Sequence, residues 1–363
     1  MAPLGLADVS RSAAAALGVP SVADTLGIGP CNQVVLLLID GLGMNLLQRH
    51  AEWAPAMSAL THTPIDAAFP TTTPVGLGSF GTGLLPGAHG LVGASFWLPE
   101  IDAVLSPLHW GAEPVPVAVQ PEPTIFEVVA RSGVRVCTVS PAAYAESGLT
   151  RAVLRGSEYR PAEDAGQRIT EVAGILRSGG PSLTYVYWLE LDRLGHEVGV
   201  DSDEWRSALT RADALVGGLL DVLVPGAALV VTADHGMVDC PEAARIPLDE
   251  DPRLMSGVEV IAGEPRARHV YVRHGAGPEV MAAWRDVLGD RVRVMSREEV
   301  VDGGLMGEVD PALAGRIGDL LAISTGTTML ASRTDSTVSR LLGQHGALTD
   351  DEVRIPGLVH RVS

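Results

Sequence analysis

The stretch Val-Val-Thr-Ala-Asp-His-Gly-Met, residues 230–237, places an acid and an imidazole directly after an apolar run. Three similar apolar runs occur earlier in the chain, at 34–39 (VVLLLI), 134–139 (VRVCTV) and 183–189 (LTYVYWL). Short runs of this kind, rich in β-branched residues, are typical of buried parallel strands. Segment 201–224 begins with acidic residues and then has apolar residues at helical spacing, which predicts a helix between two strands.

The alternation of strands and helices predicts an α/β fold with a mostly parallel central sheet. In such folds the ligand crevice lies beyond the carboxyl ends of the strands. Segments 269–273, 278–288 and 292–295 have the patterns of a strand, a helix and a strand, and they carry none of the candidate chemistry. We therefore expect one catalytic domain over residues 1–363, with a small inserted α/β lobe at about 250–310.

The composition of the chain restricts its partners. With 363 residues, 46% apolar and 19% charged, the chain can bury a large core. A net charge of −18 would repel a nucleic-acid polymer. A small phosphate ester or nucleotide remains compatible, because bound cations can reverse the field locally.

Cysteines and terminal segments bear on the compartment. The three cysteines, Cys31, Cys137 and Cys240, are too few and too scattered for a disulfide framework. The first twenty residues lack a basic segment followed by a sustained apolar one, and no apolar run is long enough to span a membrane. These features favour a cytoplasmic protein without membrane partners, and nothing in the sequence indicates its oligomeric state.

Acids and histidines follow the apolar runs at the points where the strands should end. They are Asp40, Asp192, His196, Asp234 and His235, and a further candidate, His345, lies between glycines near the C-terminus. Each alone has an ordinary structural role, such as a helix cap, a turn residue or an ion pair on a helix face. Together, at one edge of a parallel sheet, they supply the oxygen and nitrogen ligands of two zinc ions, with manganese as an alternative.

A two-metal hydrolase also needs an attacking group, and the stretch Phe-Pro-Thr-Thr-Thr-Pro at 69–74 contains the candidate hydroxyls. A hydroxyl is a weak nucleophile until a base or a metal lowers its pKa. The alternative is a proline-bounded turn whose hydroxyls cap the next helix, and the two roles are compatible.

The ordered set of motifs resembles the alkaline phosphatase superfamily, and within it the nucleotide pyrophosphatase/phosphodiesterase family. The motifs are Asp40-Gly41, the threonine-rich stretch with TGLLPGAHG at 82–90, Asp192-x-x-x-His196, ADHGM at 233–237 and Gly343-x-His345-Gly346. The resemblance covers most of the chain and implies an alkaline-phosphatase-like three-layer sandwich.

The resemblance also implies roles for these residues. One zinc would be held by Asp40, Asp234, His235 and the nucleophile, and the other by Asp192, His196 and His345. Counting back from Thr82 places the family's attacking threonine on Thr73, with Thr72 as the alternative. The implied reaction is hydrolysis of phosphodiester or nucleotide pyrophosphate bonds, in which the threonine attacks phosphorus and water then releases the phosphate.

Gly76 stands where the family has an asparagine that contacts phosphate, so we expect a backbone N–H at the start of the following helix to make that contact. Phosphomonoesterase and phosphonate hydrolase activities remain alternatives, because they share the metals and the nucleophile. A non-catalytic phosphate-ligand-binding protein is a third, but all six ligand candidates and the threonine are present.

Other polar and aromatic residues receive structural interpretations. His89 lies in a turn motif and is interpreted as structural, as are three further histidines, His62, His109 and His360. Phe96 and Trp97 follow that turn and are candidates for stacking on a substrate ring. Three arginines in the expected lobe, Arg266, Arg268 and Arg273, are interpreted as solvated surface charge.

Overall fold

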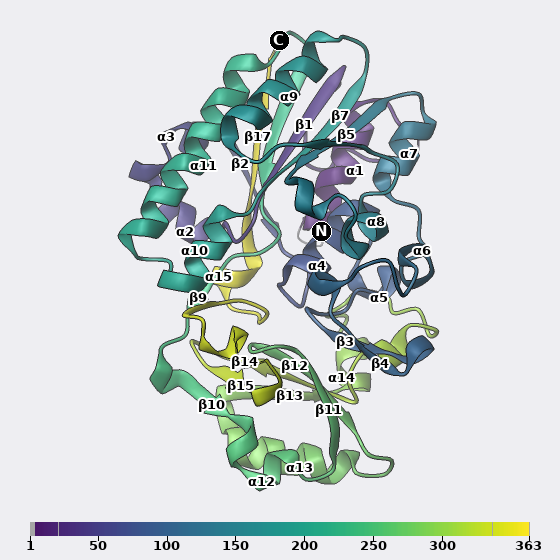
Figure 1. Cartoon of the computed structure of the whole chain (residues 1–363), viewed down its shortest axis with the longest axis vertical. Coiled ribbons are helices and arrows are strands. Elements are labelled where there is room, and N and C mark those ends of the chain that lie inside the picture. The colour runs from purple at the N-terminus through teal and green to yellow at the C-terminus, as the bar shows by residue number, and fades with distance from the viewer. Residues whose placement is uncertain (1–3, 21, 336, 363) are drawn as a thin grey trace.

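A computed structural model describes residues 4–20, 22–335 and 337–362. Its largest element is a seven-stranded sheet (Figure 1). The strands are β1 (Gln33–Ile39), β2 (Thr61–Asp66), β5 (Arg135–Ser140), β6 (Glu158–Pro161), β7 (Ser182–Trp188), β8 (Ala227–Thr232) and β17 (Arg354–Arg361). Their order is β2-β17-β8-β1-β7-β5-β6. The strands from β8 to β6 run parallel, whereas β17 is antiparallel to both of its neighbours.

Helices cover both faces of this sheet. One group packs together and against β1 and β5: α1 (Leu6–Ala16), α4 (Thr73–Thr82), α7 (Ile125–Arg131) and α8 (Gly148–Val153). A second group includes α9 (Ala165–Arg177), α10 (Glu190–Val198) and α11 (Asp203–Val222), which pack together and against β5, β7 and β8. Every residue of β1 and β8 is buried, as expected for parallel strands that are covered on both sides. The predicted α/β fold with a mostly parallel sheet is confirmed.

Short elements complete this part of the molecule. They are α2 (Met44–Arg49), α3 (Pro55–Ser58), α5 (Pro86–His89), α6 (Pro116–Val119), α15 (Asp350–Val353), β3 (Phe96–Leu98), β4 (Ala103–Leu105), β9 (Val238–Asp239) and β16 (Gly343–Gln344). Within the described ranges, none of the helices combines the length and the apolarity needed to cross a bilayer.

A second sheet forms a lobe below the first in Figure 1, with the order β11-β12-β14-β13. The elements of the lobe are β10 (Arg245–Pro247), α12 (Pro252–Met255), β11 (Val258–Glu264), β12 (Ala267–Val272), α13 (Gly277–Leu288), β13 (Val292–Ser296), α14 (Arg297–Asp302), β14 (Leu320–Ser324) and β15 (Met329–Ala331). The lobe has its own apolar core around Trp284. Its elements extend beyond the expected 250–310, because β14 pairs with both β12 and β13 and completes the sheet.

A buried ion pair joins the lobe to the C-terminal segment. The Arg266 guanidinium donates to both carboxylate oxygens of Glu352, at 2.7 and 2.8 Å, and both side chains are fully buried. Arg268, 2% exposed, pairs with Asp335. The interpretation of these two arginines as solvated charge was therefore wrong, since both side chains are buried and pair with carboxylates. Arg273, in contrast, is exposed.

The Arg266–Glu352 pair predicts a large effect on stability. Arg266→Met leaves Glu352 as a buried carboxylate without its cation, so we expect the free energy of unfolding to fall by about 3–5 kcal/mol. The double variant Arg266→Met/Glu352→Leu removes both charges and should recover part of that loss, because the N–H of Ala347 and the carbonyl of Thr328 still lack their partners. Urea unfolding followed by tryptophan fluorescence measures both.

The control is Arg253→Met, which removes an exposed ion pair with Asp251 and should leave the unfolding transition unchanged. Equal losses of stability in the single and double variants of the buried pair would contradict the prediction.

Candidate metal centre

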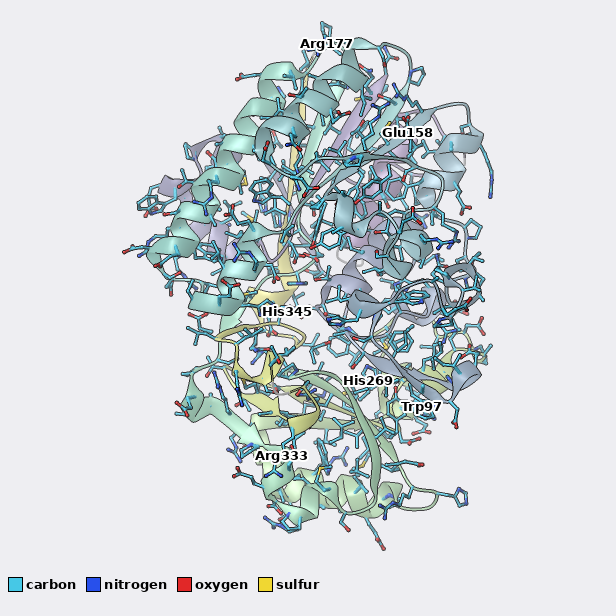
Figure 2. All side chains as sticks on the ribbon, in the orientation of Figure 1. Trp97, Glu158, Arg177, His269, Arg333 and His345 are labelled. Atoms are coloured by element: carbon cyan, nitrogen blue, oxygen red, sulfur yellow. The ribbon has the colours of Figure 1, made fainter. Side chains whose placement is uncertain are left out.

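The topology brings the candidate ligands together. Asp40 directly follows β1, Asp192 and His196 lie in α10 after β7, and Asp234 and His235 follow β8. Because β8, β1 and β7 are parallel neighbours, their carboxyl ends meet at one edge of the sheet. His345 reaches the same edge from the loop after β16 and lies between the large sheet and the lobe (Figure 2).

One cluster consists of Asp40, Asp234 and His235, all buried, with ligand atoms within 4.8 Å of one another. His235 Nε2 lies 3.5 Å from Asp40 Oδ1 and 3.6 Å from Asp234 Oδ2. The hydroxyl of Thr73 lies 3.3 Å from the same Nε2. The candidate nucleophile therefore borders this cluster.

The second cluster consists of Asp192, His196 and His345, again with ligand atoms within 4.8 Å. His196 Nε2 lies 3.5 Å from Asp192 Oδ2 and 3.2 Å from His345 Nε2. The ring of His345 stacks on that of His235 with a centroid separation of 3.7 Å. The two clusters are therefore direct neighbours, as a two-metal site requires.

Backbone carbonyls orient all three imidazoles. The Nδ1 atoms of His235, His196 and His345 lie 3.0, 2.7 and 2.8 Å from the carbonyl oxygens of Gly236, Gly343 and Thr71, respectively. A carbonyl only accepts hydrogen bonds, so each Nδ1 carries the proton and each Nε2 keeps its lone pair. This arrangement is typical of metal-ligating histidines.

The electrostatics of the site fit bound cations. Asp40 Oδ1, Asp192 Oδ1 and Asp234 Oδ2 are buried, and none has a hydrogen-bond partner within the described part of the chain. Burial, together with the charges of Asp234 and Asp192, raises the pKa of Asp40 well above its usual value. Burial and the neighbouring imidazoles lower the pKa of His345. The lone pairs of the imidazole Nε2 atoms and the unpaired carboxylate oxygens face one another, which raises the free energy of the site unless cations lie between them. The donor set therefore fits divalent metals.

Local backbone features allow these close approaches. Gly41 has a φ of 74°, which favours glycine, and turns the chain directly after Asp40. A Cβ at Gly76, in α4, would lie 2.6 Å from the Cβ of Asp234. The glycine at the position where the family has asparagine thus lets the helix that begins at Thr73 pack against a metal-ligand candidate.

The structure separates the two candidate threonines. Thr73 is the first residue of α4, and Thr72 is its N-cap, with a side chain 1% exposed. Thr73 lines a cavity of about 260 Å³ together with Asp40 and Asp192, whereas Thr72 does not line it. The sequence analysis missed two further contacts: Tyr187 donates a hydrogen bond to Asp40, and Thr71 accepts one from His345.

The remaining candidates lie elsewhere. His89 is buried between Ser79 Oγ at 3.0 Å and the N–H of Leu91, which agrees with a structural role, and burial lowers its pKa to about 3. His62, His109 and His360 are exposed and belong to neither cluster. Phe96 lies in the core, and Trp97 packs against Tyr271, apart from His345 (Figure 2). Neither aromatic residue lines the cavity beside the nucleophile candidate.

The cavity is mostly apolar. Its walls include Leu77, Leu108, Leu149, Leu154, Tyr144 and Tyr185. Of the described residues that line it, Arg193 alone carries a permanent positive charge, and its guanidinium pairs with Glu197 at 3.0 Å. The cavity therefore favours an uncharged organic group next to the clusters.

The fold and the paired clusters define an α/β protein of the alkaline-phosphatase type with two candidate metal sites. Residues 34–348 match the family model "Type I phosphodiesterase / nucleotide pyrophosphatase", and the chain belongs to this family. The resemblance found in the sequence is thereby confirmed.

Relatives agree with this assignment. The bovine bis(5'-adenosyl)-triphosphatase ENPP4 is 34% identical over 99 residues, which span 25% of this chain and 22% of that protein. The solved structure of murine ectonucleotide pyrophosphatase/phosphodiesterase 5 has a TM-score of 0.74 at 21% identity, and the match covers 90% of this chain and 88% of that one. Phosphonoacetate hydrolase from Sinorhizobium meliloti, solved with phosphonoformate, has a TM-score of 0.70 at 21% identity, with 91% and 90% covered. At these identities the two structures show the shared fold.

Because the carboxylates are crowded, we expect Asp40→Asn to have opposite effects on stability in the metal-free and the zinc-bound protein. In metal-free protein at pH 8, Asp40→Asn relieves repulsion among buried acids, so we expect the free energy of unfolding to rise by about 1–3 kcal/mol. In wild type, Zn²⁺ at a concentration of 100 times Kd should stabilise by roughly 2.7 kcal/mol per site, and Asp40→Asn should lose that gain at one site. Thermal unfolding with EDTA or Zn²⁺ measures both effects.

The control is Asp213→Asn, because the Asp213 carboxylate is also buried but accepts only from the N–H groups of Ala56 and Met57, away from the clusters. That variant should be less stable than wild type and keep the full response to Zn²⁺. An Asp40→Asn variant with the wild-type response would count against the metal assignment.

Proposed function

We propose that this protein is a two-zinc hydrolase of phosphodiester or nucleotide pyrophosphate bonds and that Thr73 is its nucleophile. The observation that carries the proposal is the position of the Thr73 hydroxyl. It lies 3.3 Å from His235 Nε2, in a cavity that Asp40 and Asp192, one from each cluster, also line. A hydroxyl in this position can reach a phosphorus atom held at both clusters.

The proposed ligands are divided between two ions. Asp40, Asp234, His235 and Thr73 would hold one, and Asp192, His196 and His345 would hold the other. Mixed carboxylate and imidazole sets suit zinc, and manganese is the alternative. When bound, the two ions supply positive charge that lowers the pKa of the nucleophile and stabilises the developing charge on the reacting oxygens.

The residues of the chain carry out a two-step exchange. The Thr73 hydroxyl gives its proton to solvent, its oxygen forms a bond to phosphorus, and the bond from phosphorus to the leaving oxygen breaks, so that the leaving group departs as an oxyanion that solvent can protonate. Water then attacks phosphorus and gives a proton to solvent, the bond to Thr73 breaks, and the threonine oxygen takes up a proton from solvent. Because Thr73 begins α4, the positive end of the helix dipole points at the phosphate group throughout.

The cavity supports an organic substituent on the phosphate. Its volume of about 260 Å³ is at the small end for ligand pockets, so it accommodates one ring-sized group. The aliphatic and tyrosine side chains that line it suit a neutral ring. The murine relative, in an inactive variant, has been solved in complex with AMP, which agrees with a substrate of this kind.

Phosphonate hydrolysis is the alternative suggested by one structural neighbour. A carboxylate-bearing phosphonate would need a free cation beside the clusters, whereas the only arginine in the described cavity wall is paired with Glu197. Hydrolysis of phosphodiester bonds is therefore favoured over hydrolysis of phosphonates. A single assay distinguishes phosphodiesterase activity from phosphomonoesterase activity and from non-catalytic binding.

The assay compares hydrolysis of bis-p-nitrophenyl phosphate and p-nitrophenyl phosphate by the zinc-loaded protein. We expect a higher kcat/KM for the diester, and a loss of at least about 1,000-fold in kcat for Thr73→Ala, since no other group would form the covalent intermediate. Thr72→Ala is the matched control and should keep most of the activity, because its side chain does not line the cavity.

The other outcomes would assign the protein differently. Faster monoester cleavage would make it a phosphatase, and an active Thr73→Ala with an inactive Thr72→Ala would move the nucleophile. Absence of turnover of either substrate by the metal-loaded wild type would favour the non-catalytic binder.

The cavity wall predicts a separate effect on substrate binding. Tyr144 is 38% exposed at the cavity and its ring lies edge-on to Tyr187 at 6.1 Å. Tyr144→Ala should raise KM for the aryl diester by about 5- to 20-fold with little change in kcat, because the organic group loses one aromatic contact. Tyr144→Phe keeps the ring and should keep the wild-type KM. Trp97→Ala, outside the cavity, serves as the control in steady-state kinetics, and an equal rise in its KM would refute the assignment of the cavity.

A further inference from the structure

We propose that Thr71 is a positioning residue that holds His345 in place relative to the nucleophile loop. The inference rests on the proposed function, because it takes His345 as a metal ligand and Thr73 as the nucleophile. Thr71 is fully buried and lies two residues before Thr73, in the loop that leads into α4. It touches no substrate cavity, so any role in the reaction would act through its neighbours.

Thr71 forms hydrogen bonds with three consecutive residues, 345–347, of the loop that carries His345, here called the ligand loop. Its hydroxyl donates to the carbonyl of Ala347 at 2.9 Å and accepts from the N–H of Gly346 at 3.0 Å. Its own N–H donates to the carbonyl of Gly346 at 3.3 Å, and its carbonyl accepts from His345 Nδ1 at 2.8 Å. Through this one residue, the nucleophile loop and the ligand loop are joined although they are more than 270 positions apart.

These contacts set both the orientation and the position of His345. The Thr71 carbonyl fixes the proton on Nδ1 and leaves Nε2 free to bind a metal. The Thr71 hydroxyl fixes the backbone directly after His345, where Gly346 has a φ of 128° that few other residues adopt. Without the hydroxyl, a buried N–H and a buried carbonyl lose their partner, and the loop is held by fewer hydrogen bonds.

A small movement of His345 would matter because the second cluster is tight. His345 Nε2 lies 3.2 Å from His196 Nε2 and 3.9 Å from Asp192 Oδ1. A metal site tolerates ligand displacements of only about 0.5 Å. The first cluster takes no ligand from the loop of His345, and Thr73 is held in the first turn of α4, so loss of the hydroxyl should weaken one site and spare the other.

The test is the affinity of each site for Zn²⁺, measured by competition with a chromophoric chelator on the metal-free full-length protein. Wild type should bind two equivalents. Thr71→Val keeps the shape of the side chain but lacks the hydroxyl, and it should weaken one equivalent by about 10- to 100-fold and leave the other within about 3-fold. Thr71→Ser retains the hydroxyl and should bind Zn²⁺ at both sites with wild-type affinity.

Thr124→Val is the matched control. Thr124 is also fully buried, and its hydroxyl donates to the carbonyl of Arg155 and accepts from the N–H of Glu127, away from the clusters. This variant should lose stability with both zinc affinities unchanged. A purely structural role of Thr71 would give the same result for Thr71→Val.

Two results would overturn the inference: wild-type affinity at both sites in Thr71→Val, or an affinity in Thr71→Ser as weak as in Thr71→Val. If Thr71→Val does not fold, Thr71→Ala provides the same comparison with a smaller side chain. If the wild-type protein binds fewer than two equivalents of Zn²⁺, the proposed function itself is contradicted. The stoichiometry of the wild type is therefore measured before any variant is compared.

Discussion

Three carboxylates share the carboxyl edge of the central sheet, and their mutual repulsion must be offset for the site to keep its shape. Tyr187 donates to Asp40, and the N–H groups of Gly41 and His235 donate to Asp234. These hydrogen bonds leave one oxygen of each aspartate in the two clusters without a partner among the described residues. Imidazole lone pairs face those oxygens, so positive charge between them would stabilise the arrangement.

The parallel sheet and the loops contribute differently to this arrangement. Asp40, Asp234 and His235 directly follow buried strands, whose register fixes where these side chains emerge. His345, in contrast, comes from a loop, and Thr73 is the first residue of α4 and follows directly on another loop that is distant in the chain. Loops of this kind hold a precise geometry only if hydrogen bonds between them restrict their motion, which explains the dense bonding around the nucleophile loop.

The sequence predicted those parts of the structure that have a local signal. A buried strand followed by an acid is visible as an apolar run that stops at Asp40 or Asp234. Arg266 was misjudged because its carboxylate partner, Glu352, is 86 positions away, and nothing near the arginine in the sequence indicates burial. The contact of Tyr187 with Asp40 was missed for a similar reason: it depends on the register between two strands, which the sequence does not display.

The lobe acts on the site without supplying a ligand candidate. The carboxylate of Glu352 binds Arg266 of the lobe and accepts from the N–H of Ala347, two residues after His345. The backbone carbonyl of Glu352 accepts from the N–H of Gly236, next to His235. One buried acid thus touches both ligand loops and is held by a charge from the lobe. The arginine therefore fixes the position of a carboxylate that the loop of His345 uses as an acceptor, and of the backbone whose carbonyl the loop of His235 uses. The lobe therefore contributes to the architecture of the candidate metal centre through a buried charge and the backbone that this charge holds.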